Sequence, residues 1–208
     1  MTRVEKSAFS MLRRLGAVVF LGFLAAACAK EPPAPAAPSS VSFEARPAIR
    51  MNIASVSVDS RFTPSGREPY VEHLHRVSPS SIAQAWARAR LVTTGNRGTA
   101  TLTVLDGTVI SETLQKKGGL TGVFGDQLDT RLKARLKARL TVDLPGPNAG
   151  DFNSWTADVD ANAERTILES ASLNERDAAY AALMQSLAAK FDAALTAEIE
   201  RSMGPVLR

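Results

Sequence analysis

Two histidines, His73 and His75, are the clearest candidates for metal chemistry, because they are the only imidazoles in the chain. On an extended chain, side chains two residues apart point the same way, so both imidazoles could hold one ion. A protein metal site needs three or four ligands, and Glu72 is the neighbouring carboxylate. His73 and His75 are therefore candidate metal ligands, with two ordinary loop histidines as the alternative. No cofactor is expected.

No group of residues has the spacing of a catalytic centre. The sequence contains no Gly-x-Ser-x-Gly elbow, no Walker phosphate loop and no His-Glu-x-x-His motif. Asp158 and Asp160 alternate on an expected solvent face, where nothing would separate their pKa values into those of an acid and a base. We therefore predict that the protein is not an enzyme.

Cys28 is the only cysteine, which excludes an intramolecular disulfide. It follows a basic N-terminus and an uncharged run at residues 15–27. Such a run is shorter than the roughly 20 residues that span a bilayer, but it is typical of a secretory signal peptide. We predict that residues 1–27 are a signal peptide. A free thiol in an exported protein would be reactive, and acylation would remove that reactivity.

The stretch 24–28, Leu-Ala-Ala-Ala-Cys, resembles the lipobox of bacterial lipoproteins, with Ala25 where that family usually has leucine. The resemblance implies cleavage before Cys28 and a diacylglyceryl group on its sulfur. Two or more acyl chains make membrane attachment stable. In that family an aspartate after the cysteine favours the inner membrane. Ala29 and Lys30 follow here, which implies an outer-membrane lipoprotein facing the periplasm.

Charge and composition set the domain plan. Without residues 1–27 the chain keeps 21 basic and 20 acidic residues, so no nucleic-acid partner is expected. Residues 28–47 contain five prolines without apolar periodicity, which indicates a lipid anchor and an extended tether. Residues 48–208 are long enough for a single domain with its own core.

The first half of that domain predicts a strand, a helix and a further strand. Apolar residues alternate over 49–58 with a phase slip near Ala54, which indicates one strand with a bulge. Ser78-Pro79 is a helix start, and helical spacing continues to about Leu91. Alternation resumes at 100–104. The Asp106-Gly107 pair fits either a hairpin turn or a bulge in one long strand.

The second half predicts two long strands and a long helix. Residues 128–144 alternate between apolar and basic side chains, yet two Lys-Ala-Arg-Leu repeats also favour helix. We predict a strand, because the alternation persists through Thr141-Val142-Asp143-Leu144. Residues 155–163 alternate with an acidic face, which could pair with the basic face across strands. A capping box at Ser172 starts a helix over 173–203.

The predicted fold class is therefore α+β, in the order β-α-β-β-β-α. We expect a mostly antiparallel sheet of four or five strands with two helices on one face.

Two surfaces are candidates for contacts. The glycine-rich segment 118–125 could offer apolar side chains to a partner or a lipid surface, or fold them back on the core. Those side chains are Leu120, Val123 and Phe124. The basic face of the long strand could bind anionic lipid head groups, or be an ordinary solvated face. Its residues are Arg131, Lys133, Arg135, Lys137 and Arg139.

The combination of Cys28, the proline tether, long strands and a closing helix is similar to small envelope lipoproteins. These include auxiliary lipoproteins of ABC-type lipid transport systems and the lipoprotein that plugs the lipopolysaccharide-assembly barrel. Two short segments resemble uncharacterised lipoproteins of alphaproteobacteria. They are residues 71–74, Val-Glu-His-Leu, and residues 171–176, Ala-Ser-Leu-Asn-Glu-Arg. The resemblance implies a non-enzymatic accessory that docks on an envelope protein complex. A periplasmic lipid- or metal-binding module is the alternative.

Overall fold

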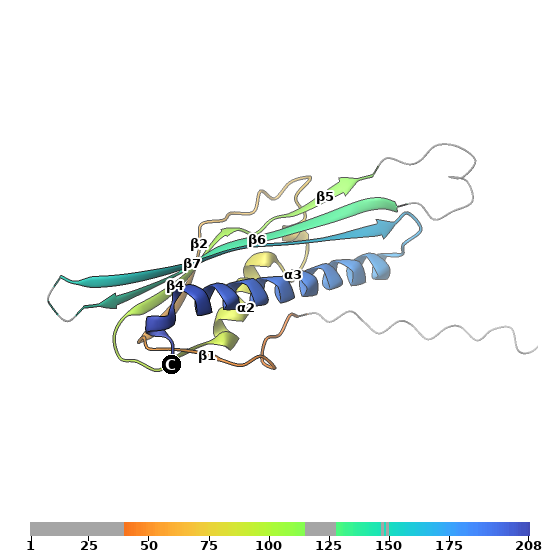
Figure 1. Cartoon of the computed structure of the whole chain (residues 1–208). Coiled ribbons are helices and arrows are strands. Elements are labelled where there is room, and N and C mark those ends of the chain that lie inside the picture. Colours follow the sequence, from red (N-terminus) through yellow and green to blue (C-terminus); the bar gives the residue numbers. More distant parts are fainter. Residues whose placement is uncertain (1–39, 115–127, 147, 149) are drawn as a thin grey trace, which may run out of the picture. The chain divides into compact units, whose positions relative to one another are not determined.

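The computed structural model describes residues 40–114, 128–146, 148 and 150–208. It shows an α+β fold in which helices pack on a curved sheet, confirming the predicted class (Figure 1). The strands are β1 (Ile49–Met51), β2 (Ser55–Ser60), β3 (Leu91–Thr93), β4 (Thr99–Asp106), β5 (Val109–Thr113), β6 (Leu128–Pro145) and β7 (Phe152–Leu168). The helices are α2 (Pro79–Arg90) and α3 (Leu173–Ser202), with 3-10 turns at Glu72–Leu74 and Gly204–Val206.

The main sheet is built around β6. The strand β7 pairs antiparallel with β6 along its whole length. The strands β4 and β5 follow one another, also antiparallel, along the opposite edge of β6. The strand β2 pairs with β4 in parallel. The sheet is therefore mixed, with one parallel pair in an otherwise antiparallel arrangement.

The position of β4 and β5 settles the two readings of Asp106-Gly107. Both strands pair with the same edge of β6, with a register shift between Val104 and Asp106. The pair is thus an interruption in one long strand and makes no hairpin. A Cβ on Gly107 would lie 2.8 Å from the Ser80 hydroxyl oxygen, so a residue without a side chain suits this position.

The prediction of a single bulged strand over 49–58 was wrong. The strands β1 and β2 belong to different sheets, and β1 pairs in parallel with β3, which the sequence did not reveal. The phase slip marks the change of sheet, where Ile53 is buried and the Ala54 amide bonds the carbonyls of Arg97 and Gly98. Helical spacing up to Leu91 concealed β3, because its first residue is also buried against the core.

The strand prediction for 128–144 is confirmed. The inward row of β6 is buried beneath the helices, whereas its outward row is basic. Those inward residues are Leu132, Ala134, Leu136, Ala138, Leu140 and Val142. Tertiary burial of one face every second residue outweighs the helix propensity of the repeats, because each buried leucine contributes roughly 2 kcal/mol and propensity differences are below about 1 kcal/mol per residue.

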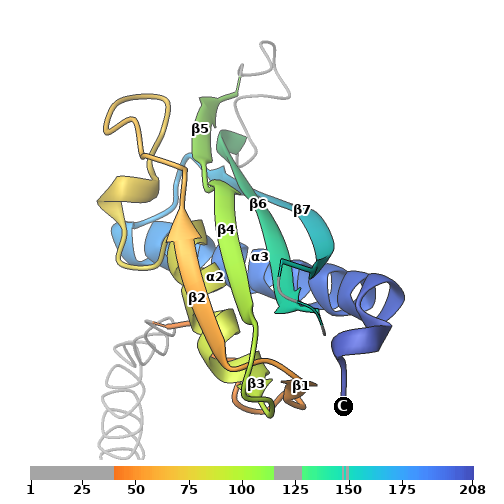
Figure 2. The same ribbon diagram turned by 90° about the vertical axis from the view of Figure 1, so that its left-hand side faces the viewer.

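Both helices lie on one face of the main sheet, as predicted (Figure 2). Ser78 and Ser172 are N-caps, and each helix has a capping box with Ser81 and Glu175 respectively. The helix α3 buries a stripe that includes Leu187 against the sheet. Within the described part of the chain, no helix combines the length and apolar character needed to cross a membrane.

Candidate docking site on the helix face

A buried polar cluster joins the two helices. The Asp192 carboxylate on α3 accepts hydrogen bonds from Trp86 Nε1 and Arg90 Nε on α2, each at 2.8 Å, through one oxygen. Arg90 Nη2 also donates to the Thr196 hydroxyl at 2.9 Å. Arg90 is 4% exposed and Asp192 is 5% exposed. The cluster is an ion pair shielded from solvent, so each charge depends on its partner.

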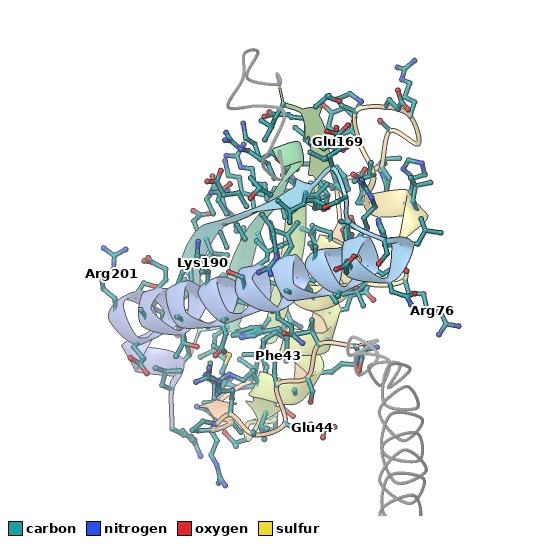
Figure 3. All side chains as sticks on the ribbon, turned by 90° about the vertical axis from the view of Figure 1, so that its right-hand side faces the viewer. Phe43, Glu44, Arg76, Glu169, Lys190 and Arg201 are labelled. Atoms are coloured by element: carbon teal, nitrogen blue, oxygen red, sulfur yellow. The ribbon has the colours of Figure 1, made fainter. Side chains whose placement is uncertain are left out.

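The N-terminal segment 40–47 packs against the same cluster. Phe43 is 5% exposed and belongs to the hydrophobic core. Arg46 Nε lies 3.5 Å from the second oxygen of Asp192. Figure 3 shows Phe43 beside α3 on this segment. The tether was predicted to run to residue 47, but the chain already packs on the helix layer at Phe43.

A shallow groove follows α3 where this segment lies. Val41 and Gln185 border two adjoining hollows, of about 270 and 290 Å³. The first hollow is lined by polar and apolar surface in equal parts and includes Asp192. The second is more apolar and is lined by Leu74, His75, Val77, Tyr180, Ala181 and Met184, among others. A groove of this kind can receive an apolar side chain or a short acyl segment.

His75 is held in the second hollow by an aromatic stack. Its ring lies 3.6 Å from that of Tyr180, with planes 16° apart. The Tyr180 hydroxyl donates to the Val77 carbonyl at 2.9 Å. Burial lowers the pKa of His75, against an opposing effect of Asp177, and so favours the neutral imidazole. Burial and the charge of Glu72 raise the pKa of Tyr180.

The two predicted metal ligands do not lie on an extended chain. His73 is exposed on the 3-10 turn Glu72–Leu74, and His75 follows that turn. Glu72 is itself buried and accepts a hydrogen bond from the Val109 amide. Among the residues with described positions, no three potential metal ligands cluster together.

The predicted basic face is largely paired with carboxylates. Arg139 donates two hydrogen bonds to Asp158, at 2.8 and 3.1 Å. Arg135 donates to Asp160 at 2.9 Å, and this bond holds the pKa of Asp160 below its usual value. These contacts confirm the predicted meeting of basic and acidic strand faces. Lys133 pairs with Glu112 at 2.8 Å. The charge of Lys137 also lowers the pKa of Asp160. Arg131 has a buried Nε.

Several predicted contact residues lie outside the described residues. These are the lipidation site Cys28 and the apolar residues Leu120, Val123 and Phe124. In contrast, the cluster of Asp192, Arg90 and Trp86 was missed by sequence reasoning. Its only trace in the sequence is an aspartate directly after Phe191, within the apolar stripe of the last helix.

The sequence matches no protein-family model, and no curated protein matches it.

Proposed function

We propose that the chain is an envelope lipoprotein, anchored by lipid on Cys28, that serves as a non-enzymatic accessory docking on an envelope protein complex. The observation that carries this proposal is the order of features along the chain. A basic N-terminus and an uncharged run precede a lone cysteine, a proline-rich stretch follows, and Phe43 then packs into the folded domain. This order is what a domain held close to a bilayer requires.

The packing of segment 40–47 shortens the free tether. The stretch from Cys28 to Ser40 has eleven intervening residues, which makes twelve residue-to-residue steps. At about 3.1 Å per residue in polyproline II conformation, that stretch reaches roughly 40 Å. The lipid would then keep the domain within about one domain diameter of the membrane. We propose an outer-membrane location with the domain in the periplasm, from Ala29 and Lys30 after the cysteine.

Replacing the anchoring cysteine tests this proposal. We expect Cys28→Ser to move nearly all of the protein from the membrane fraction to the soluble fraction, because no acyl chain can then be attached. Ser40→Ala is the matched control and should remain membrane-bound. Mass spectrometry of the wild-type protein should show a lipid-modified N-terminal cysteine. An unmodified thiol, or retention of Cys28→Ser on membranes, would refute the lipid anchor.

A periplasmic ligand-binding module is the second candidate, favoured by the mostly apolar hollow beside His75 and Tyr180. Native mass spectrometry of the same purified protein distinguishes the two functions. A stoichiometric non-covalent lipid or metal would support the binding module. Its absence, together with the lipid on Cys28, would leave the accessory function.

A further inference from the structure

The outer edge of β7 is a long strand edge to which no described strand is paired. β7 has 17 residues, and among the described strands it pairs only with β6. The Arg135 amide in β6 donates to the Thr108 carbonyl, so Arg135 turns its backbone groups away from β7. Its register partner is Asn162. In an antiparallel ladder, the backbone groups of Asn162 and of every second residue along β7 therefore face outward.

The opposite side of the sheet is closed in two ways. The edge of β5 is covered by residues 69–71, where the Val71 amide donates to Val109 and the Ser111 amide donates to Pro69. The outermost strand there, β2, has only six residues. Proteins commonly shorten or cover exposed strand edges because such edges recruit other strands. The long edge of β7, which contains no proline, stands out against this pattern (Figure 2).

The β7 residues whose backbone groups face this edge have their side chains on the open face of the sheet, the face that the helices do not cover. Acidic residues form a row along the middle of the strand: Asp158, Asp160 and Glu164. Apolar residues lie near its ends, with Phe152 71% exposed and Leu168 39% exposed. The Asp158 and Asp160 side chains bond β6 cations on one side and remain 52% and 38% exposed. A carboxylate has about four acceptor positions, so each can take a second cation from the other side.

We propose that the outer edge of β7 is a docking site for an extended segment of a partner protein that adds as a further strand. The segment carries lysine or arginine at alternate positions opposite Asp158, Asp160 and Glu164, with apolar residues towards its ends. Main-chain hydrogen bonds to β7 hold the segment, and the charge row selects it. This inference rests on the proposed accessory function and names the surface that would serve it.

A second copy of the chain fits this edge poorly. Antiparallel pairing of two β7 strands about Asp160 would place Asp160 opposite its counterpart. Shifting the pairing by one step places Asp158 opposite Asp160 instead. Like charges directly opposite each other destabilise a strand pair, so the acidic row favours a basic partner over self-association.

Lys190 on α3 regulates access to this edge. Its ammonium donates to the Asn162 backbone carbonyl at 2.9 Å and so occupies one acceptor on this edge. Figure 3 shows Lys190 on α3. An incoming strand must displace this contact. Loss of the Lys190 amine should therefore strengthen binding of the incoming strand, whereas loss of the Asn162 backbone N–H should weaken it.

Peptide binding tests the proposal. The probe is a labelled synthetic peptide with the sequence of residues 131–141, which forms the natural basic partner of β7 within the fold. The full chain, purified in detergent, is titrated into the peptide while the fluorescence anisotropy of the peptide is measured. Two control peptides are used. In one, each Lys and Arg is replaced with Glu; the other carries N-methyl groups at alternate residues to block strand pairing. We expect both controls to bind at least about tenfold more weakly.

Matched protein variants locate the binding. Asn162→Pro removes a backbone N–H that faces the outer edge, without removing a hydrogen bond to β6. It should weaken binding of the probe at least about tenfold. Lys190→Met should strengthen it several-fold, and Thr101→Ala, elsewhere on the open face, should leave it unchanged. Melting temperatures verify that each variant is folded. If Asn162→Pro is not, the Lys190→Met variant and the N-methylated peptide decide.

Three results would overturn the inference: no binding of the basic probe, equal binding of the N-methylated probe, or undiminished binding to folded Asn162→Pro. A dimer in sedimentation experiments that Asn162→Pro abolishes would identify a second copy as the occupant and also overturn it. Each result is independent of the Cys28→Ser experiment. If Cys28→Ser releases the protein from membranes but the wild-type chain does not bind the probe, the lipid anchor is supported and only the β7 docking site is rejected.

Discussion

Asp192 is a charged residue on the buried side of a helix, and its partners explain why it is tolerated there. Trp86 and Arg90 both donate to it, so the carboxylate is compensated by a full positive charge and an additional hydrogen bond. A buried ion pair contributes little net stability compared with an apolar pair, but removing one member leaves the other uncompensated. The cluster therefore specifies how α2 and α3 meet.

We expect Asp192→Ala to lower the free energy of unfolding by about 3–5 kcal/mol, because it leaves the Arg90 guanidinium buried without its counter-charge. Asp158→Ala is the matched control. It breaks the exposed pair with Arg139 and should cost less than about 1 kcal/mol. Urea denaturation of both variants measures the difference. Similar losses in the two variants would show that the Asp192 pair is not shielded as described.

At the scale of elements, the segment 40–47 is the part of the chain that links the proposed anchor to the fold. Its attachment depends on Phe43 and on the contact between Arg46 and Asp192. Arg46 is mostly exposed, so its ion pair is screened and contributes little. Burial of the Phe43 ring therefore dominates the attachment of this segment.

Phe43→Ala should cost about 3 kcal/mol or somewhat more, as is usual for loss of a buried aromatic ring. The same variant should release the segment and accelerate cleavage after Glu44 by a glutamate-specific protease. Ser40→Ala, at an exposed position of the same segment, serves as control and should change neither property. Urea denaturation and timed proteolysis give the two measurements. Unchanged cleavage in Phe43→Ala would mean that other contacts hold the segment.

Among the elements, those with a strong local pattern were predictable. The strict alternation of 128–144 and the capping box at Ser172 gave β6 and α3 close to their observed bounds. The strand β3 and its pairing with β1 were not predictable, because three residues contain too little periodicity. Their pairing depends on a close approach at Gly95, where a Cβ would lie 2.6 Å from the Asn52 carbonyl carbon.

At the scale of the whole molecule, the sheet has one face under helices and one open face with charges of both signs. The cations of β6 suggested a surface for anionic lipid, but neighbouring carboxylates compensate several of them. Five free cations near an anionic membrane would contribute about 1 kcal/mol each, or more than about a thousandfold in affinity. A membrane would meet both rows of charge together, so the carboxylates beside the cations reduce this attraction.

The Cys28→Ser chain should therefore bind anionic vesicles no more than about tenfold better than neutral vesicles, well below the strength that five free cations would give. Replacing the acids with Asp158→Asn and Asp160→Asn together should increase the preference for anionic vesicles, since Arg139 and Arg135 are then uncompensated. Vesicle co-sedimentation at low salt measures both. Strong selective binding by the Cys28→Ser chain would contradict charge compensation on this face.

The sequence alone determined the features that depend on neighbouring residues: the alternation that makes β6 and β7, and the caps of α2 and α3. Only the tertiary structure decided which strands are neighbours, that β2 pairs in parallel, and that β4 and β5 share one edge of β6. It also revealed the Arg90–Asp192 pair, whose members lie 102 residues apart. The physical reason is that periodicity and capping act within a few residues, whereas strand order and buried charge pairing depend on contacts between distant segments.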